Sequence, residues 1–194
     1  MPKTMVTLTH GDTMIQSPDA ELVRQVFLGL IDKPAASTAV SDAPAIGEYW
    51  YGQGGIYVGK VFGRDGQPDY HLIFAEHDLG KKEWGGYNKE SKATSKWDGL
   101  ANTKALLESD VSHPAAAAAA GYSTDEHHDF YLPSAAELYQ GWVNVPDLFA
   151  KEYHWSSSQR SAYYAYLMVF GAGVQSTSGK GLELSVRPVR RFIR

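Results

Sequence analysis

Residues 131–138, YLPSAAEL, carry the clearest structural signal in the chain. Ser134 and Glu137 have the spacing of a capping box, in which the serine side chain accepts a hydrogen bond from the helix backbone and the glutamate side chain accepts one from the serine backbone. Apolar residues at helical spacing follow the box. The pattern predicts a helix that begins after Ser134 and continues to about Gly141.

Downstream of this helix the pattern changes to that of strands. Residues 153–170 and 174–192 alternate in polarity and are interrupted by glycines. Alternation of this kind is typical of antiparallel strands joined by turns. We therefore expect the C-terminal region to form an antiparallel meander.

Upstream, residues 48–78 contain β-branched and aromatic runs separated by glycine-containing turns, which predicts two or three antiparallel strands. Residues 81–96 are polar and contain glycines, so we expect a surface loop there. Residues 97–109 are predicted to form a helix, because Leu100 and Leu107 fall at helical spacing.

The alanines at residues 115–120 lie between Pro114 and Gly121. Low complexity of this kind is compatible with disorder. Proline at the start and glycine at the end, however, bracket a short helix. The bracket favours a packed helical turn over disorder.

The N-terminal region, residues 1–32, is predicted to form a short strand and then a helix. Ser17 is the expected N-cap and Pro18 the first helical residue. An apolar stripe along this helix favours packing against another surface. The stripe consists of Leu22, Val23, Val26, Phe27 and Leu30.

Residues 33–47 are rich in proline, alanine and serine, the composition of a connector. We therefore expect two regions: residues 1–45, with the strand, helix and connector, and a domain over residues 46–194. A hairpin, helices and a terminal meander place that domain in the α+β class.

The composition excludes several classes of protein. The absence of cysteine rules out disulfides, cysteine-ligated zinc and a cysteine nucleophile. With 18 lysines and arginines against 22 acidic residues, and no long basic stretch, the chain is not expected to bind nucleic acid. Residues 1–19 lack the apolar core of a Sec-type signal peptide, and no apolar run is long enough for a membrane span.

Several short motifs resemble functional sites, but their contexts favour structural roles. Residues 51–55 are glycine-rich but lead into a strand, so a turn is favoured over a phosphate-binding loop. Residues 67–69, QPD, resemble the sugar-selecting tripeptide of calcium-dependent lectins, but they follow a turn signal. His127, His128 and Asp129 are consecutive, so their side chains diverge, and a polar loop is favoured over a metal site.

The serines at residues 156–158 have no base paired with them, and serines at a strand start commonly bond to nearby backbone. The sequence therefore contains no convincing catalytic constellation and no metal-ligand spacing. We expect a protein that is not an enzyme, with no cofactor and no bound calcium or zinc.

Three segments in this order carry a resemblance to a known family: residues 131–138, residues 153–158 (YHWSSS) and residues 186–192 (VRPVRRF). Together they resemble the C-type-lectin-like domain at the end of Legionella collagen-like adhesin and its relatives. The resemblance spans residues 46–194 and is strongest from Phe130 onward. It implies a C-type-lectin-like fold, in which two helices pack on small antiparallel sheets and the C-terminal region is rich in strands.

Within that family, residues 155–191 look most similar to the variable proteins of diversity-generating retroelements, which phages and their hosts carry. In such proteins a fixed lectin-like scaffold displays mutated residues to new ligands. The resemblance implies a ligand- or receptor-binding module.

The family pattern also implies which side chains face the ligand. It points Tyr166, Met168 and Phe170 into the core, and alternation along a strand then points Leu167 and Val169 outward. The alternative is that both faces of this strand are buried, the second against residues 1–45 or another subunit. The candidate ligand-binding residues are Tyr163, Tyr164, Leu167, Val169, Ala172, Val174, Ser176 and Ser178.

Four further residues are expected to belong to the scaffold. Trp155 and Pro188 are predicted to be structural, with the indole filling the core. Arg187 and Arg190 are expected to tie the C-terminal segment to loops through carboxylates such as Glu137.

The sequence thus favours a phage tail or fibre-tip receptor binder, or a retroelement-diversified target protein, whose ligand is a cell-surface protein or glycan. The alternative is a structural virion or assembly subunit. An enzyme of the formylglycine-generating type, which has a related fold, is excluded because its chemistry needs cysteines. We expect a homo-oligomer, located in a virion or in the bacterial cytoplasm before assembly or export.

Overall fold

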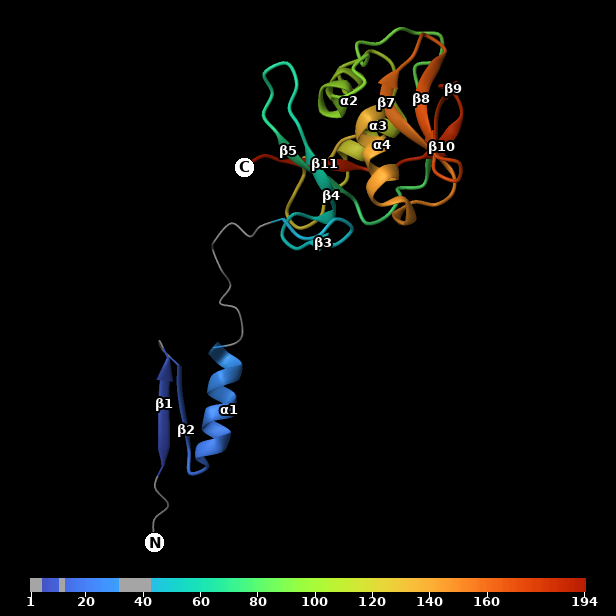
Figure 1. The fold of residues 1–194 in the computed structure, drawn as a ribbon. Coiled ribbons are helices and arrows are strands. Elements are labelled where there is room, and N and C mark those ends of the chain that lie inside the picture. The colour runs from blue at the N-terminus through green and yellow to red at the C-terminus, as the bar shows by residue number, and fades with distance from the viewer. Residues whose placement is uncertain (1–4, 11–12, 32–42) are drawn as a thin grey trace. The chain divides into compact units, whose positions relative to one another are not determined.

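The computed structural model describes residues 5–10, 13–31 and 43–194 (Figure 1). The chain divides into two compact units, Met1–Asp42 and Ala43–Arg194. The sequence-based boundary lies three positions later, after residue 45. The described residues form helices together with separate, mainly antiparallel sheets, which confirms the α+β class.

The first unit contains the antiparallel strands β1 (Val6–His10) and β2 (Thr13–Ser17), followed by helix α1 (Ala20–Ile31). The region therefore holds two strands where one was predicted. The N-cap is Asp19 instead of Ser17, because the Asp19 carboxylate accepts hydrogen bonds from the backbone of Glu21 and Leu22 at 3.0 and 3.1 Å. Ser17 is still part of β2.

The predicted apolar stripe of α1 is only partly buried. Val23 is fully buried, whereas Leu22 and Val26 are about half exposed. The side chains of Phe27 and Leu30 lie outside the described part of the chain, as do residues 33–42 of the predicted connector.

The larger unit contains two sheets. The first has the order β11-β5-β4-β3 and is antiparallel throughout, which confirms the strands predicted in residues 48–78. The register between β4 and β5 shifts between Tyr57 and Gly59. The strands are β3 (Tyr49–Trp50), β4 (Gly55–Val61), β5 (Tyr70–Phe74) and β11 (Val189–Phe192).

The second sheet has the order β6-β10-β7-β8-β9. The antiparallel meander is confirmed for β7, β8 and β9, but it is wrong for the last two strands. Strand β10 lies parallel to β7, and the chain then crosses to the other sheet as β11. The strands are β6 (Lys81–Glu83), β7 (Tyr153–Gln159), β8 (Tyr164–Val169), β9 (Val174–Gly179) and β10 (Glu183–Ser185).

Three helices lie between β6 and β7, two strands of the second sheet, and the 3₁₀ turn η1 (Pro146–Leu148) follows the last helix. Helix α4 contacts both sheets and lies between them in Figure 1. Its capping box is formed as predicted: Ser134 Oγ accepts from the Glu137 amide at 3.2 Å, and Glu137 Oε2 accepts from the Ser134 amide at 2.8 Å. The helices are α2 (Gly99–Leu107), α3 (Pro114–Ala120) and α4 (Ala135–Asn144).

Helix α2 buries a different face from the one the apolar spacing suggested. Leu100 and Leu107 are about half exposed, whereas Asn102, Thr103 and Leu106 are buried. The reason is that the polar pair is satisfied internally, with Asn102 Nδ2 donating to Ser95 O at 2.6 Å and the Thr103 hydroxyl to Leu132 O at 3.2 Å. Buried polar groups are tolerated when they are hydrogen-bonded in this way.

Strand β8 lies between two core clusters. On one face, Leu167 packs in a cluster with Trp84 and Trp155. On the other face, Met168 packs in a cluster that includes Leu138 of α4. The larger unit itself therefore covers both faces of β8 at Leu167 and Met168.

This arrangement corrects two sequence-based predictions. Leu167, expected to face solvent, is only 5% exposed, and Val169 is half-buried against the same cluster. Residues 81–96, predicted as a surface loop, contain β6 and the fully buried Trp84, whose indole Nε1–H donates to Ser156 O at 2.8 Å. The segment that covers Leu167 is therefore one that local polarity had assigned to the surface.

The alanine helix α3 provides a test of this packing. Ala116 is fully buried, whereas Ala117 is exposed on the next position of the same helix. Ala116→Leu should overpack the core and lower the free energy of unfolding by about 1–3 kcal/mol. Ala117→Leu, the matched control, should change it by less than about 0.5 kcal/mol in urea unfolding. Equal effects at both positions would contradict the packed helix.

Candidate functional site

The structure places the accessible members of the predicted ligand-binding set on β8, on β9 and in the turns beside them, with Tyr164 on the opposite face of the sheet from Val174, Ser176 and Ser178. Tyr163 and Tyr164 are 45% and 50% exposed, and Val174 is 50% exposed. Ala172 and Ser176 are exposed and Ser178 is half-buried, whereas Leu167 is buried and Val169 is half-buried against the core. We call the accessible group the display edge; it consists of Tyr163, Tyr164, Ala172, Val174, Ser176 and Ser178.

The sequence did not predict a further exposed tyrosine, Tyr87, which lies against the display edge and is counted with it from here on. Tyr87 is 60% exposed, and its ring lies 5.5 Å from that of Tyr163 in an edge-to-face arrangement. The two tyrosines are far apart in sequence, and Tyr87 lies in the segment predicted as a loop. Only the position of Trp84, an apolar anchor three residues earlier, could have indicated that this segment is held against the sheet.

A buried lysine supports the display edge from below. The ammonium group of Lys180 donates to Lys89 O at 2.8 Å and to Gln159 Oε1 at 2.6 Å, and it lies 4.6 Å from the centre of the Trp84 ring. The Lys180 amide also donates to Tyr163 O at 3.0 Å. Burial lowers the pKa of this amine to about 8. Lys180 thus joins the Tyr87 segment to β7 and to the bend before β8 that contains Tyr163.

The predicted scaffold residues are buried, but their partners differ from those expected. Trp155 is fully buried and donates its indole N–H to Lys82 O at 2.9 Å. Arg187 pairs with Asp78 at 2.6 Å, and Arg190 holds Asp129 through two hydrogen bonds of 2.8 and 3.1 Å. Pro188 is buried between them.

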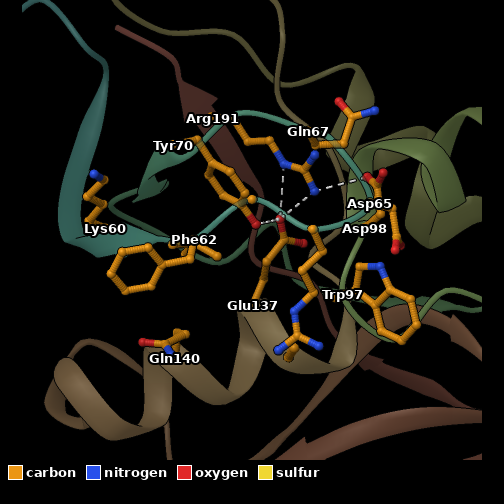
Figure 2. A pocket seen from close by; sticks show the side chains of 14 residues that line it. Lys60, Phe62, Asp65, Gln67, Tyr70, Trp97, Asp98, Glu137, Gln140 and Arg191 are labelled. Carbon is orange, nitrogen blue, oxygen red and sulfur yellow. Dashed lines mark hydrogen bonds and ion pairs between the residues drawn. The ribbon is translucent and has the colours of Figure 1, made fainter.

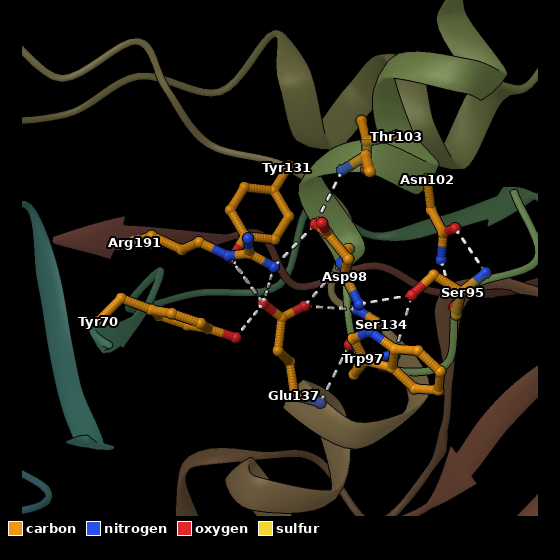
Figure 3. Close-up of polar contacts among 12 residues, drawn as sticks. Tyr70, Ser95, Trp97, Asp98, Asn102, Thr103, Tyr131, Ser134, Glu137 and Arg191 are labelled. Carbon is orange, nitrogen blue, oxygen red and sulfur yellow. Dashed lines mark hydrogen bonds and ion pairs between the residues drawn. The ribbon is translucent and has the colours of Figure 1, made fainter. Parts of the chain in front are cut away.

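The expected partner of these arginines, Glu137, is bound instead by Arg191, whose Nη2 lies 3.0 Å from Glu137 Oε1 (Figure 3). The same oxygen accepts from the hydroxyls of Tyr70 and Tyr131 at 2.9 and 2.7 Å. Oε2 accepts from the amide of Gly99 at 3.2 Å in addition to the capping-box bond. Glu137 is 1% exposed, so these protein donors take the place of the hydrogen bonds that water would make to its carboxylate.

The electrostatics of this cluster fix its protonation. Burial, followed by the nearby Glu137 charge, raises the pKa of Tyr70 and Tyr131 well above the usual range. Burial alone would lower the pKa of Arg191, but the tyrosines and the carboxylates of Glu137 and Asp98 raise it overall. The tyrosines are therefore neutral donors and Arg191 stays charged across the whole physiological range.

A pocket of about 500 Å³ opens above this cluster, beside the turn of the β4–β5 hairpin (Figure 2). Arg191 and Glu137 form its base, and Phe62 and Trp97 are two exposed aromatic side chains in its wall. We call it the hairpin pocket. Its remaining lining includes Lys60, Arg64, Asp65, Gln67, Tyr70, Asp98 and Gln140. Sequence reasoning missed it because its residues come from four separate segments.

The motifs that resembled functional sites have structural contacts. His127 Nε2 lies 2.8 Å from Gly52 O, and Asp129 is held by Arg190. The serines at 156–158 are buried, and residues 67–69 end the hairpin turn, where Asp69 pairs with Lys60 at 2.8 Å. In the part of the chain that the structure describes, no group of three or more histidines and carboxylates is placed to hold a metal ion.

No helix among the described residues combines the length and apolar character that crossing a bilayer would need. Comparison of the sequence with models of protein families gives no match, and comparison with curated proteins gives none either.

The buried lysine predicts an unusual pH dependence of stability. The folded chain releases the Lys180 proton at about pH 8, whereas its ordinary pKa is 10.5. Between these values the unfolded chain binds more protons, so raising the pH stabilises the fold. Urea unfolding between pH 8 and pH 9.5, below the range where tyrosines ionise, should show a free energy of unfolding that rises with pH. The slope should be that expected for about one titrating group.

Lys180→Met should remove this rise, and Lys92→Met, a change at an exposed lysine, should retain it. A flat profile for the unaltered protein would show that Lys180 is not buried as an ammonium.

Proposed function

We propose that the chain is a non-enzymatic ligand- or receptor-binding protein that uses the display edge, on a C-type-lectin-like scaffold, to contact a cell-surface protein or glycan. The observation that carries the proposal is that exposed tyrosines lie next to a buried set of hydrogen bonds made by Lys180. Tyr87, Tyr163 and Tyr164 are each at least 45% exposed, whereas Lys180 is fully buried.

The chemistry of the display edge favours recognition over catalysis. Tyrosine offers a large contact area with few rotatable bonds, and small hydroxyl residues such as Ser176 adapt their hydrogen bonds to a partner. A rigid support lowers the entropy lost on binding. Lys180 supplies such support, because it bonds to backbone or side-chain atoms in three separate segments.

We further propose that the protein acts in a virion as a phage tail receptor binder or as a retroelement-diversified variable protein. The sequence resemblance over residues 155–191 supports this assignment. The alternative, a structural virion or assembly subunit, would use the lectin-like scaffold for packing. Neighbouring DNA distinguishes the two: an imperfect repeat of these codons, differing at adenines, supports diversification. Its differences should fall on exposed positions such as Tyr163 and Ser176 and avoid Trp155 and Leu167.

Substitutions on the display edge should separate binding from stability. The intact protein is first screened on arrays of bacterial surface proteins and glycans. Tyr163→Ala and Tyr164→Ala should each weaken the strongest interaction by about tenfold or more, equivalent to at least about 1.4 kcal/mol, while the melting temperature stays nearly unchanged. Exposed substitutions seldom cost more than about 0.5 kcal/mol of stability.

Leu167→Ser is the matched core variant. Because Leu167 is buried, this change should lower the free energy of unfolding by more than about 2 kcal/mol. If Tyr163→Ala and Tyr164→Ala lower the melting temperature as much as Leu167→Ser does, or leave binding unaltered, the display edge is not the ligand surface.

We also propose that the protein is a homo-oligomer held together through its first unit. Units of about 40 residues rarely bury enough apolar surface to be stable alone. In this one, Leu22, Val26 and Met14 are all at least 45% exposed. Oligomerisation would also strengthen weak single-site binding through multivalency.

Deleting residues 1–45 should leave a folded domain of lower oligomeric order than the full chain, for which a trimer is expected if the protein caps a fibre. Light scattering measures the mass, and far-UV circular dichroism checks the fold. A monomeric full-length protein would contradict the proposal.

A further inference from the structure

The hairpin pocket lies apart from the display edge, since none of the residues of that edge lines it. Its charges are the informative feature. Three carboxylates line it, those of Asp65, Asp98 and Glu137. Arg191 is shared between two of them, at 2.9 Å from Asp98 and 3.0 Å from Glu137. The base of the pocket therefore holds one cation against two carboxylates.

The two remaining cations of the lining do not have equal roles. Lys60 is neutralised by Asp69, which is 2.8 Å away and is not part of the lining. Arg64 takes part in no ion pair of the described residues. Its guanidinium instead lies 5.6 Å from the centre of the Trp97 ring, within the range of a cation–π contact.

The Trp97 ring is therefore already in contact with the Arg64 guanidinium of the same chain. That guanidinium is exposed and lies on a hairpin turn, where Asp65 and Gly66 have φ values of 54° and 80°. Because Arg64 has no carboxylate partner, moving it away from Trp97 breaks no ion pair. It would leave a wall of aromatic and acidic side chains open to solvent.

We propose that the hairpin pocket binds the guanidinium of an arginine side chain presented by a protein partner, and that this group replaces Arg64 on Trp97. A guanidinium is planar and weakly hydrated, so it stacks on an indole and still donates to carboxylates at its edge. Asp98 is adjacent to Trp97 in sequence, and its side chain is 27% exposed. Its carboxylate can accept the N–H groups of the incoming arginine.

Other features favour an arginine of a polypeptide over other ligands. The carboxylates disfavour an anion, and the net charge of −4 attracts a cation from a distance. Phe62, 74% exposed at the mouth, offers apolar contact to the residues that flank the arginine in a partner chain. The volume of about 500 Å³ is ample for one side chain with its flanking backbone.

The test is a titration of the full-length protein with Nα-acetyl-arginine amide, followed by calorimetry and by the Trp97 indole signal in NMR spectra. The probe for charge is Nα-acetyl-citrulline amide, which has nearly the same shape but no charge. Arginine should shift the Trp97 signal, and citrulline should bind at least about tenfold more weakly. About 0.5 M salt should weaken arginine binding, because part of the attraction is between charges that solvent reaches.

Two variants and one control complete the experiment. Arg64→Gln removes the competing guanidinium and should strengthen arginine binding by about threefold or more. Asp98→Asn should weaken it by about fivefold or more. Asp98 is the N-cap of α2 and accepts a hydrogen bond from the Ala101 amide at 3.0 Å, and asparagine is also a good N-cap, so the helix start is kept. Arg160→Gln changes the net charge equally at an exposed arginine outside the pocket, and it should leave the affinity unchanged.

Equal binding of citrulline would overturn the proposal, as would a shift of the Trp97 signal with methyl glucoside and none with arginine. So would an Arg64→Gln protein that binds arginine no more tightly than Arg160→Gln does. If Asp98→Asn fails to fold, as judged by its melting curve, Arg64→Gln still decides. Loss of display-edge binding in the tyrosine variants would not alter these results, because the pocket shares no residue with that edge.

Discussion

The buried carboxylate of Glu137 is the interaction on which the larger unit depends. Its two oxygens accept hydrogen bonds from the starts of α2 and α4, from Tyr70 in β5 and from Arg191 in β11. A carboxylate in the protein interior is stable only when donors and a counter-ion surround it. Glu137 has both, so one side chain fixes the positions of two helices relative to two strands. The hairpin pocket and its base exist because of this arrangement.

Local signals in the sequence were sufficient for part of this structure. The capping box, the alanine tract between proline and glycine, and the turn signals around β4 and β5 each act within a few residues, and the corresponding elements are present. The capping box also predicted the hydrogen bond between the Glu137 side chain and the start of α4. What it could not indicate was the second role of that residue, because the tyrosines and Arg191 come from distant parts of the chain.

The sequence-based predictions that were wrong share one physical origin, which is packing between segments distant in sequence. Leu167 and Trp84 are buried by segments far from them in sequence, so neither the alternation along β8 nor the polarity of residues 81–96 could reveal it. Packing between segments distant in sequence also places Tyr87 against Tyr163 and Arg64 against Trp97. The family pattern also predicted that one face of β8 was free, whereas both faces are covered at Leu167 and Met168.

The closing strand β11 has a consequence for how the chain folds. It pairs with β5, and next to it Arg187 bonds to Asp78, 109 positions earlier in the sequence. Bringing such distant segments together costs loop-closure entropy before any contact compensates for it. Rates of folding fall as such distant contacts come to dominate. Until β11 arrives, β5 presents the apolar side chains of Leu72 and Phe74 on an unpaired edge, the kind of surface that promotes aggregation. Slow synthesis at low temperature therefore favours recovery of the native protein from an expression host.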